Sequence, residues 1–482
     1  MKLSDIFDSG VEYAARDLEI TGLTADSRAV KPGFLFAALQ GVTAHGRDFV
    51  EQAKANGAIA MLSAGDVGAD PGVAHVVAPE ARRAFALAAS RFYPRRPGTI
   101  VAVSGTNGKS STVDFLRQIW AHAGKRAASL GTLGAITPSG VIDLGHTTPD
   151  PARVHAMLTQ LADEGVTHVA MEASSHGLEQ HRIDGLRFDA AAFTNLTQDH
   201  LDYHRDMGAY RDAKLKLWAL VKDGAPAVIN ADAAEGDVFE RDAKARGLDI
   251  WLCGWRAPRE HALKIVEIQP RPNAQTMLLL WAGKECRVEL PLIGEFQALN
   301  AVCAATLALA LGEKPEAVWG GLEKLKPVKG RMEHVGASKN GGHVFVDYAH
   351  TPDGLDVLLR AARPHAPGRI IAVFGCGGDR DADKRAKMGA IAERQADVVI
   401  VTDDNPRNED AAAIRAQIVR GATSASEIGD RAEAIRAAIA MMKPGDAVMI
   451  AGKGHETGQI IKGVVHPFSD QDIARAALGS RS

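Results

Sequence analysis

One glycine-rich loop constrains the fold of this chain more than any other stretch. Residues 99–103 are apolar and mostly β-branched and predict a buried strand, and Val113, Leu116, Ile119 and Trp120 are spaced as on an amphipathic helix. The loop between them is Gly105, Thr106, Asn107, Gly108, Lys109, Ser110 and Ser111. In such a loop, backbone N–H groups close around phosphate oxygens, the lysine neutralises charge and a serine hydroxyl can bind Mg²⁺. We therefore expect a triphosphate site.

The loop is a variant of the standard P-loop. Val103 stands five residues before Gly108, where the standard loop has a glycine. An ordinary turn between a strand and a helix that happens to contain Gly-Lys-Ser is the alternative interpretation. The order of strand, glycines, lysine and hydroxyls favours the phosphate interpretation.

The composition is that of a globular protein without a strong charge. A length of 482 residues suggests about three domains, and the hydrophobic content of 46% is ordinary. The net charge of −3 gives no electrostatic case for nucleic acid or an anionic membrane.

The longest apolar run, 301–311, is too short to span a bilayer, and acidic residues near the start argue against a signal peptide. Four widely separated cysteines indicate neither zinc nor disulfides, so we expect a cytoplasmic protein. We also expect a monomer.

Proline and glycine clusters at 93–98 and 325–331 divide the chain into three expected domains, 1–88, 89–330 and 331–482. We predict the α/β class, with a central P-loop mononucleotide-binding sheet and a C-terminal Rossmann-like, doubly wound sheet. In the first domain, polar loops at 26–28 and 43–48 flank a strand-like segment. They are either surface turns or a small-ligand site.

In the central domain, polar residues follow two strand-like segments, 168–171 and 190–193. Because ligands gather at the carboxyl ends of parallel strands, Glu172 and His200 become candidate Mg²⁺ ligands; helix capping or exposure is the alternative. Gln297 and Asn300 are three residues apart and can bond a flat base, or they can simply begin a helix. By spacing alone, Lys214 is a helix lysine that reaches to solvent.

The C-terminal domain shows four strand-like segments, 344–346, 370–374, 398–401 and 447–450, each followed by a polar loop. Four polar loops at one sheet edge indicate a ligand site. The glycines after 374 are not a dinucleotide fingerprint, because Arg380 stands where the third glycine belongs.

Five motifs, at 105–111, 171–177, 199–202, 347–352 and 452–456, occur in the order found in Mur ligases, and the chain resembles that family. The resemblance implies an ATP-dependent ligase of peptidoglycan synthesis, which contributes to cell-wall biogenesis, cell shape and cell division. A further loop resembles that of the members that add meso-2,6-diaminopimelate to UDP-N-acetylmuramoyl-L-Ala-D-Glu: Asp404, Asn405, Pro406 and Arg407.

The resemblance also implies roles for individual residues. ATP is expected at 105–111 with Gln297, Asn300, Arg331, Asp347 and His350, and Mg²⁺ at Ser110, Glu172, His200 and Lys214, the last as a carbamate. The expected catalytic residues are Lys109, Glu172, His200 and Lys214. Ser27 matches the UDP site. The muramoyl-dipeptide positions are His146, Thr147, Thr148, Ser174, Gln180 and Arg182. The diaminopimelate positions are Arg380, Asp404, Asn405, Pro406, Arg407, Gly452 and Glu456.

Two alternatives stay open at this point. A ligase that adds lysine, or one of the folylpolyglutamate type, shares the P-loop and the lysine at position 214. The 404–407 loop and the Ser27 region favour diaminopimelate as the added amino acid. A nucleotide-binding regulatory protein without catalysis is a different class. The presence of Lys109, Glu172, His200 and Lys214 argues against it.

Overall fold

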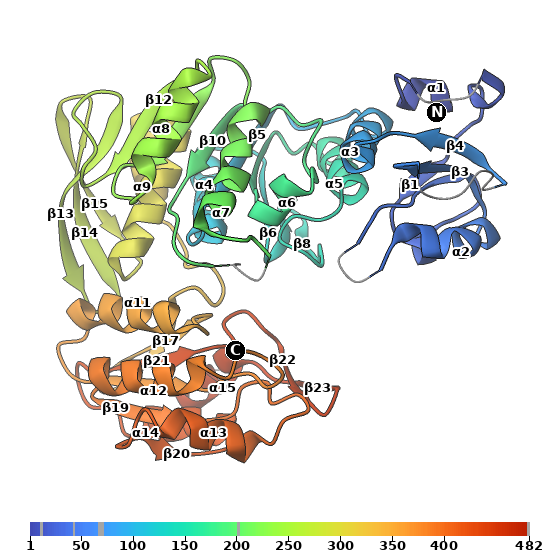
Figure 1. Cartoon of the computed structure of the whole chain (residues 1–482). Coiled ribbons are helices and arrows are strands. Elements are labelled where there is room, and N and C mark those ends of the chain that lie inside the picture. The colour runs from blue at the N-terminus through green and yellow to red at the C-terminus, as the bar shows by residue number, and fades with distance from the viewer. Residues whose placement is uncertain (10–12, 42–43, 66–71, 200–202, 480–482) are drawn as a thin grey trace. The chain divides into compact units, whose positions relative to one another are not determined.

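The computed structural model describes residues 1–9, 13–41, 44–65, 72–199 and 203–479. The chain divides into two compact units (Figure 1). Unit 1 comprises Met1–Leu252 and Thr306–Lys314, and unit 2 comprises Cys253–Ala305 and Pro315–Ser482. Among the described residues, no helix is long and apolar enough to cross a membrane.

Unit 1 begins with a small parallel sheet in the order β1-β2-β3-β4. Its strands are β1 (Gly22–Thr24), β2 (Phe34–Ala37), β3 (Ala58–Ser63) and β4 (Ala74–Val77), and its helices are α1 (Leu3–Ile6), α2 (Val50–Ala55) and α3 (Ala81–Phe92). Phe85 of α3 packs with Leu35 and Leu62 in the core of this part. The strand-like segment that the polar loops flank in the sequence is strand β2.

The P-loop strand lies inside a larger sheet of unit 1, where the strand order is β11-β10-β5-β9-β6-β7-β8. The strands are β5 (Thr99–Ser104), β6 (Ala127–Gly131), β7 (Gly134–Thr137), β8 (Gly140–Ile142), β9 (His168–Glu172), β10 (Ala190–Phe193) and β11 (Pro226–Asn230). The helices are α4 (Lys109–His122), α5 (Pro151–Asp163), α6 (Ser175–Glu179), α7 (Met207–Leu215) and α8 (Gly236–Ala245). The first five strands of this order are parallel, so the segments that follow β5, β9 and β10 meet at one edge.

Helix α4 begins at Lys109, four residues before Val113, the first residue of the apolar spacing. Gly108 adopts a left-handed conformation (φ +84°) at the helix N-cap, so the chain turns directly from the loop into the helix. Val113, Leu116, Ile119 and Trp120 are buried as the spacing predicts. The loop amides therefore lie at a helix N-terminus, where the helix dipole favours an anion.

Unit 2 contains antiparallel strands and a doubly wound sheet. Strands β13 (Ala262–Arg271), β14 (Ala274–Trp281) and β15 (Lys284–Leu290) are antiparallel. Strand β12 (Asp249–Gly254) begins in unit 1 and helix α9 (Glu295–Ala310) ends there, whereas helix α10 (Pro315–Leu322) lies in unit 2.

The second sheet of unit 2 has the order β16-β17-β21-β18-β19-β20, with only β16 antiparallel to its neighbour. Its strands are β16 (Glu333–Ala337), β17 (His343–Asp347), β18 (Ile370–Phe374), β19 (Val398–Val401), β20 (Ser426–Glu427) and β21 (Ala447–Ala451). One core holds side chains of α11 (Pro352–Ala362), α12 (Lys384–Gln395) and α13 (Ala411–Val419), and another those of α14 (Arg431–Ala440) and α15 (Asp470–Ala477). The predicted doubly wound sheet is confirmed, whereas the hairpin of β22 (Gly458–Ile461) and β23 (Val464–Pro467) was not predicted.

Candidate active site

The P-loop is braced by the segment that follows β10, residues 194–197. A side chain at Gly105 (φ +148°) would place its Cβ 1.9 Å from the Thr194 hydroxyl, so only glycine fits there. That hydroxyl donates to the carbonyl of Asn107 at 2.6 Å. The amide of Asn107 donates to Asn195 Oδ1 at 2.9 Å. The loop geometry is therefore set by a neighbouring strand end as well as by its own glycines.

The first turn of α4 supplies a cation and a hydroxyl. Lys109 Nζ donates to the carbonyls of Gly105 and Thr106 at 2.8 and 2.7 Å. Ser110 Oγ donates to Glu172 Oε1 at 2.8 Å, in buried surroundings. Lys109 thus lies against its own loop, and Ser110 is joined to the carboxylate that ends β9.

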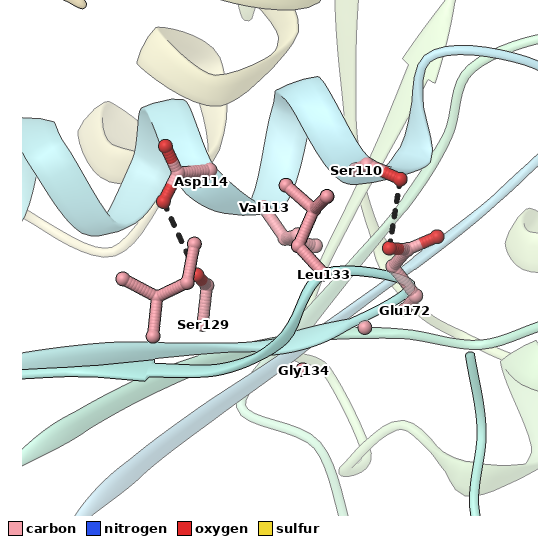
Figure 2. A pocket seen from close by; sticks show the side chains of 9 residues that line it. Ser110, Val113, Asp114, Ser129, Leu133, Gly134 and Glu172 are labelled. Carbon is pink, nitrogen blue, oxygen red and sulfur yellow. Dashed lines mark hydrogen bonds between the residues drawn. The ribbon is translucent and has the colours of Figure 1, made fainter. Parts of the chain in front are cut away.

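The Glu172 carboxylate is enclosed by a turn after β6. It is 2% exposed and accepts the backbone amide of Thr132 at 2.8 Å. A Cβ at Gly131 would lie 2.0 Å from Glu172 Oε1, so a side chain there would displace the carboxylate. Figure 2 shows this carboxylate beside Ser110 in a small pocket whose other end is lined by Asp114 and Ser129. Sequence reasoning missed Gly131 and Thr132, because no local pattern ties them to the end of another strand.

The oxygens of Ser110 and Glu172 suit a magnesium ion. Mg²⁺ prefers hard oxygen ligands and is commonly held by one or two protein groups together with phosphate and water. Among the described residues, no three His, Cys, Asp or Glu side chains gather into a metal-binding group. The predicted ligand His200 lies outside the described residues.

Lys214 of α7 is buried beside the P-loop. Its side chain is 1% exposed, its Nζ donates to the carbonyl of Gly105 at 2.8 Å, and it lies 4.4 Å from the centre of the Tyr210 ring. The interpretation from spacing alone, a lysine that reaches to solvent, is therefore wrong. Burial, with a smaller effect from Lys109, holds the pKa of Lys214 well below its ordinary value, which favours the neutral amine.

A cluster of polar side chains lies where β9 ends. Arg182 Nη1 donates to the carbonyl of Thr148 at 2.7 Å, and Arg182 Nη2 donates to Gln180 Oε1 at 2.9 Å. Thr148 Oγ1 also accepts the amide of Ser174 at 3.1 Å. The structure therefore brings together four of the six residues expected at the muramoyl-dipeptide.

The other two predicted positions precede this cluster in the sequence. Thr147 Oγ1 lies 3.0 Å from Thr132 Oγ1, on the turn that encloses Glu172, and His146 is exposed. Ser27, in the small N-terminal sheet region, is 6% exposed and donates to Gln52 Oε1 at 2.7 Å. The Ser27 hydroxyl can therefore still accept a hydrogen bond, whereas donating to a ligand would require an exchange of this one.

In unit 2, the residues expected near adenine form a buried chain of amides. Gln297 and Asn300 of α9 are 1% and 7% exposed. Asn300 Nδ2 donates to Gln297 Oε1 at 3.2 Å, and Gln297 Nε2 donates to the carbonyl of Arg331 at 2.9 Å. Arg331 in turn lies 4.7 Å from the centre of the Tyr348 ring. The predicted group of Gln297, Asn300 and Arg331 is therefore contiguous.

Asp347 and His350 belong to the turn after β17. The Asp347 carboxylate accepts the amides of Met332 and Ala349 at 2.6 and 2.7 Å, which fixes this turn to the segment around Arg331. His350 is exposed, and its Nδ1 lies 2.9 Å from the carbonyl of Tyr348.

The loops after β19 and β21 meet at the carboxyl edge of the doubly wound sheet. Asp404 and Asn405 are 8% and 4% exposed, and Asn405 Nδ2 donates to Glu456 Oε2 at 2.9 Å. A Cβ at Gly452 (φ +116°) would lie 2.5 Å from Asp404 Oδ2, so glycine is required there. Four of the predicted diaminopimelate residues therefore form one cluster.

Arg407 extends this cluster toward the loop after β18. Its backbone is left-handed (φ +52°), its amide donates to the carbonyl of Ile460 at 3.0 Å, and its Nη1 donates to Gly378 O at 2.8 Å. Pro406 is buried between these contacts, and Arg380 of the same β18 loop is exposed. The hairpin β22–β23, absent from the sequence expectations, is thus what fixes the Arg407 backbone.

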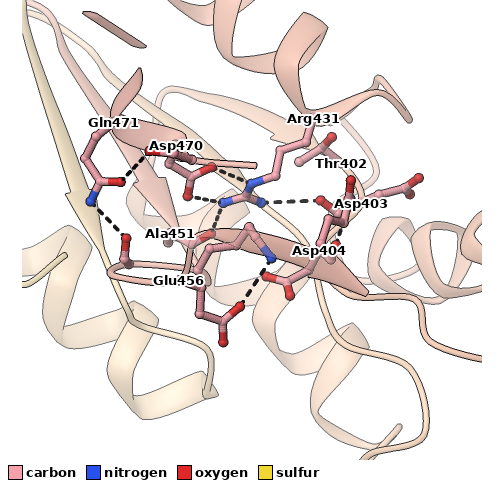
Figure 3. A network of polar contacts seen from close by, with 12 residues as sticks. Thr402, Asp403, Asp404, Arg431, Ala451, Glu456, Asp470 and Gln471 are labelled. Atoms are coloured by element: carbon pink, nitrogen blue, oxygen red, sulfur yellow. Dashed lines mark hydrogen bonds and ion pairs between the residues drawn. The ribbon is translucent and has the colours of Figure 1, made fainter. Parts of the chain in front are cut away.

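A buried ion pair supports both loops from behind (Figure 3). Arg431 of α14 and Asp470 of α15 have fully buried side chains, with Nε–Oδ1 and Nη2–Oδ2 distances of 2.7 and 2.8 Å. Arg431 Nη2 also donates to the carbonyl of Ala451, at the end of β21, at 3.0 Å. Nothing in the spacing of Arg431 and Asp470 in the sequence indicates that they pair.

The parallel sheet with a glycine-rich loop before α4 places the chain in the class of P-loop α/β proteins. Three family models match it: the Mur ligase middle domain at residues 103–308, the Mur ligase glutamate ligase domain at 330–454, and the Mur ligase family catalytic domain at 19–92. The chain belongs to the Mur ligase family, which confirms the resemblance based on its motifs.

The relatives share most of its length. A Caulobacter vibrioides protein named UDP-N-acetylmuramoyl-L-alanyl-D-glutamate–2,6-diaminopimelate ligase is 49% identical, with 97% of each chain covered. A protein of the same name from Agrobacterium fabrum is 50% identical over 96% of this chain and 94% of its own. A solved structure of a ligase with this name matches with a TM-score of 0.76 and 33% identity, covering 99% of both chains.

Proposed function

We propose that this chain is the ATP-dependent ligase that joins meso-2,6-diaminopimelate to the D-Glu γ-carboxylate of UDP-N-acetylmuramoyl-L-Ala-D-Glu in peptidoglycan precursor synthesis. The observation that carries the proposal is the identity of 49% to a ligase of that name over almost the whole chain. The cluster of Asp404, Asn405 and Glu456 beside Arg407 supports the choice of amino acid.

The P-loop is the proposed site of the ATP phosphates. Its amides, the Lys109 ammonium and the N-terminal end of α4 together favour a triphosphate. Gln297, Asn300 and Arg331 are proposed to bind the nucleoside, together with Asp347 and His350.

Ser110, Glu172, His200 and a carbamate on Lys214 are proposed to hold Mg²⁺, which would neutralise charge on the phosphoryl group during transfer. The low pKa of Lys214 supports the carbamate, because only a neutral amine can react with carbon dioxide. The carbamate would replace the cation by an anionic oxygen ligand.

In the proposed reaction, the γ-phosphoryl group passes to the D-Glu γ-carboxylate and forms an acyl phosphate. The neutral amine of diaminopimelate attacks the carbonyl carbon, and phosphate leaves from the tetrahedral intermediate. Lys109 and the loop amides stabilise the developing negative charge, and no protein nucleophile takes part.

Arg407 is the proposed partner of the distal carboxylate of diaminopimelate, which lysine lacks. A guanidinium binds a carboxylate through two hydrogen bonds but leaves a bare ammonium unpaired. Glu456, with Asp404 and Asn405, is proposed to face the ammonium on the same carbon. Arg380, Pro406 and Gly452 complete the amino-acid site.

The substrate's other parts have proposed sites in unit 1. Ser27 is assigned to the UDP group, and the muramoyl-dipeptide to His146, Thr147, Thr148, Ser174, Gln180 and Arg182. The functional division is then 1–88 for UDP, 89–330 for ATP and 331–482 for the amino acid. We further propose that the protein acts as a monomer in the cytoplasm.

Phosphate release with ATP and UDP-N-acetylmuramoyl-L-Ala-D-Glu tests this function when diaminopimelate, lysine or ornithine is added in turn. Strong stimulation by diaminopimelate alone is expected. Stimulation by lysine instead would favour a lysine-adding ligase, and nucleotide binding without release in any mixture would favour a regulatory protein.

A further inference from the structure

The segment between β21 and β22 carries a lysine that the proposed function leaves without a role. The Lys453 side chain is fully buried, at 0% exposure. Its neighbours Gly452 and Gly454 both have positive φ, +116° and +53°. A Cβ at Gly454 would lie 2.6 Å from Tyr348 Cβ, so this tight turn depends on glycine. The turn holds the Lys453 side chain inside the protein.

The buried ammonium of Lys453 joins two residues of the proposed amino-acid site. Lys453 Nζ donates to Asn405 Oδ1 at 2.9 Å and to Glu456 Oε2 at 3.2 Å. Asn405 Oδ1 also accepts the amide of Ile460 at 3.0 Å. Because two donors face Oδ1, the amide nitrogen of Asn405 must point the other way, toward Glu456.

The group of Lys453, Asn405 and Glu456 differs from a surface ion pair because its ammonium is buried. The Glu456 side chain is 34% exposed, whereas that of Lys453 is completely enclosed. A buried ammonium is tolerated only when it is paired, so Asn405 and Glu456 are held in one arrangement with the carboxylate at the surface of the site. The Lys453 side chain lies deeper in the protein than Glu456 and donates hydrogen bonds to both Asn405 and Glu456.

We propose that Lys453 is a positioning residue that sets the amino-acid specificity of this site. The proposal rests on the proposed function, with Asn405 and Glu456 facing diaminopimelate. Lys453 fixes their orientation and supplies the positive charge that offsets Glu456. The site can then accept an end group that carries an ammonium and a carboxylate together.

The charges around Lys453 explain why its removal should weaken the preference for diaminopimelate over lysine. Glu456 is the acidic partner of Lys453 in this hydrogen-bonded group and Asn405 is neutral, so the two formal charges balance. Removing the ammonium leaves the Glu456 carboxylate without this partner and makes the surroundings of the end group one charge more negative. An acidic site repels a second carboxylate and attracts a bare ammonium, which favours lysine over diaminopimelate.

The test compares Lys453→Met with Lys443→Met, a change at an exposed lysine of the same unit. Initial rates give kcat and KM for diaminopimelate, lysine and ATP, and thermal unfolding reports the fold. For Lys453→Met, the diaminopimelate KM should rise about 10-fold or more, the effect of losing hydrogen bonds to a charged group. The preference for diaminopimelate over lysine should fall by a similar factor, with the ATP KM unchanged. The control should match the wild type.

Equal losses with both amino acids, or a parallel rise in the ATP KM, would overturn the proposal and indicate a purely structural lysine. If Lys453→Met does not fold, the double variant Lys453→Met/Glu456→Gln removes the unpaired carboxylate too. It should bind diaminopimelate weakly and still reject lysine, and acceptance of lysine would contradict the charge argument. A wild-type enzyme that ignores diaminopimelate would instead refute the proposed function itself.

Discussion

The P-loop in unit 1 and the loops at the edge of the doubly wound sheet in unit 2 are built in different ways. The P-loop is shaped by backbone amides, two glycines and the hydroxyl and amide groups of Thr194 and Asn195. The unit 2 loops are fixed by charged side chains, above all the buried pair of Arg431 and Asp470.

This difference matches the two kinds of ligand proposed. A phosphate can be bound by amides that any sequence supplies, provided that glycine allows the turn. Discrimination between diaminopimelate and lysine requires charges placed at one end of the ligand, and these must be supported from behind. Changes in the first region should therefore affect every reaction, and changes in the second should affect one substrate.

The largest effect is expected at Lys109. Lys109→Ala removes the cation of the P-loop and should lower kcat on the order of 10²–10³-fold or more with every amino acid, because charge on the transferred phosphoryl loses its partner. Steady-state phosphate release measures this effect, and circular dichroism should show an unchanged fold. Lys244→Ala, at an exposed position of α8, is the control. Near-normal turnover of the Lys109→Ala variant would contradict a role for Lys109 in stabilising the transferred phosphoryl group.

At Arg407, the expected effect is smaller and confined to one substrate. Arg407→Ala should raise the KM for diaminopimelate by roughly 10- to 100-fold, as for loss of a charge-assisted bidentate contact, with the ATP KM unchanged. Arg436→Ala, an exposed arginine of α14, should behave as the wild type. Similar changes in both KM values would mean that Arg407 supports the fold rather than the amino acid.

Gly105 tests whether the P-loop shape itself matters. Gly105→Ala puts a methyl group 1.9 Å from Thr194 Oγ1, and the resulting overpacking should cost about 1–3 kcal/mol of unfolding free energy and lower kcat/KM for ATP. Gly140→Ala has a comparable positive φ of +139° but no atom within 4 Å of the added Cβ. This control should leave the kcat/KM for ATP unchanged. Equal losses in the two variants would mean that backbone strain alone, and not the contact with Thr194, causes the effect.

Acidification should lower the unfolding free energy of both units through two buried histidines that lie outside the P-loop and the sheet-edge loops. Burial lowers the pKa of His155 in unit 1 and of His334 in unit 2 to about 4. An unfolded chain takes up these protons near pH 6.5, so the stability present above that pH is lost as the pH falls toward 4. For the fully buried His155 the full loss is roughly 3 kcal/mol, of which about 2 kcal/mol is lost by pH 5. Urea unfolding of the wild type and of His155→Gln at pH 7 and 5 measures it; an unchanged pH dependence in the variant would contradict the assignment.

Much of the fold could be predicted from the sequence because its signals are local. Strands β10, β18 and β19 match the predicted segments residue for residue, since each is a short apolar run that ends in a polar loop. Strand ends in a parallel sheet share an edge, which places Glu172 near the P-loop without knowledge of any contact. The P-loop glycines and the order of the motifs can also be recognised in the sequence without the structure.

The remaining features depend on contacts between distant segments. Spacing alone suggested an exposed Lys214, because a helix pattern does not show that the P-loop covers it. The turn of Gly131 and Thr132 around Glu172, and the pairing of Arg431 with Asp470, join residues about 40 positions apart. Lys453 lies within a predicted motif, but its burial distinguishes it from a surface lysine only in three dimensions.

Isotope transfer tests the central proposal most directly: unit 1 activates a carboxylate and unit 2 selects the amine. The D-Glu γ-carboxylate of the substrate is labelled with ¹⁸O, and the released phosphate is analysed by mass spectrometry with diaminopimelate or lysine. The proposed mechanism predicts one labelled oxygen in each phosphate with diaminopimelate and almost no release with lysine. Unlabelled phosphate, or equal release with both amino acids, would contradict it.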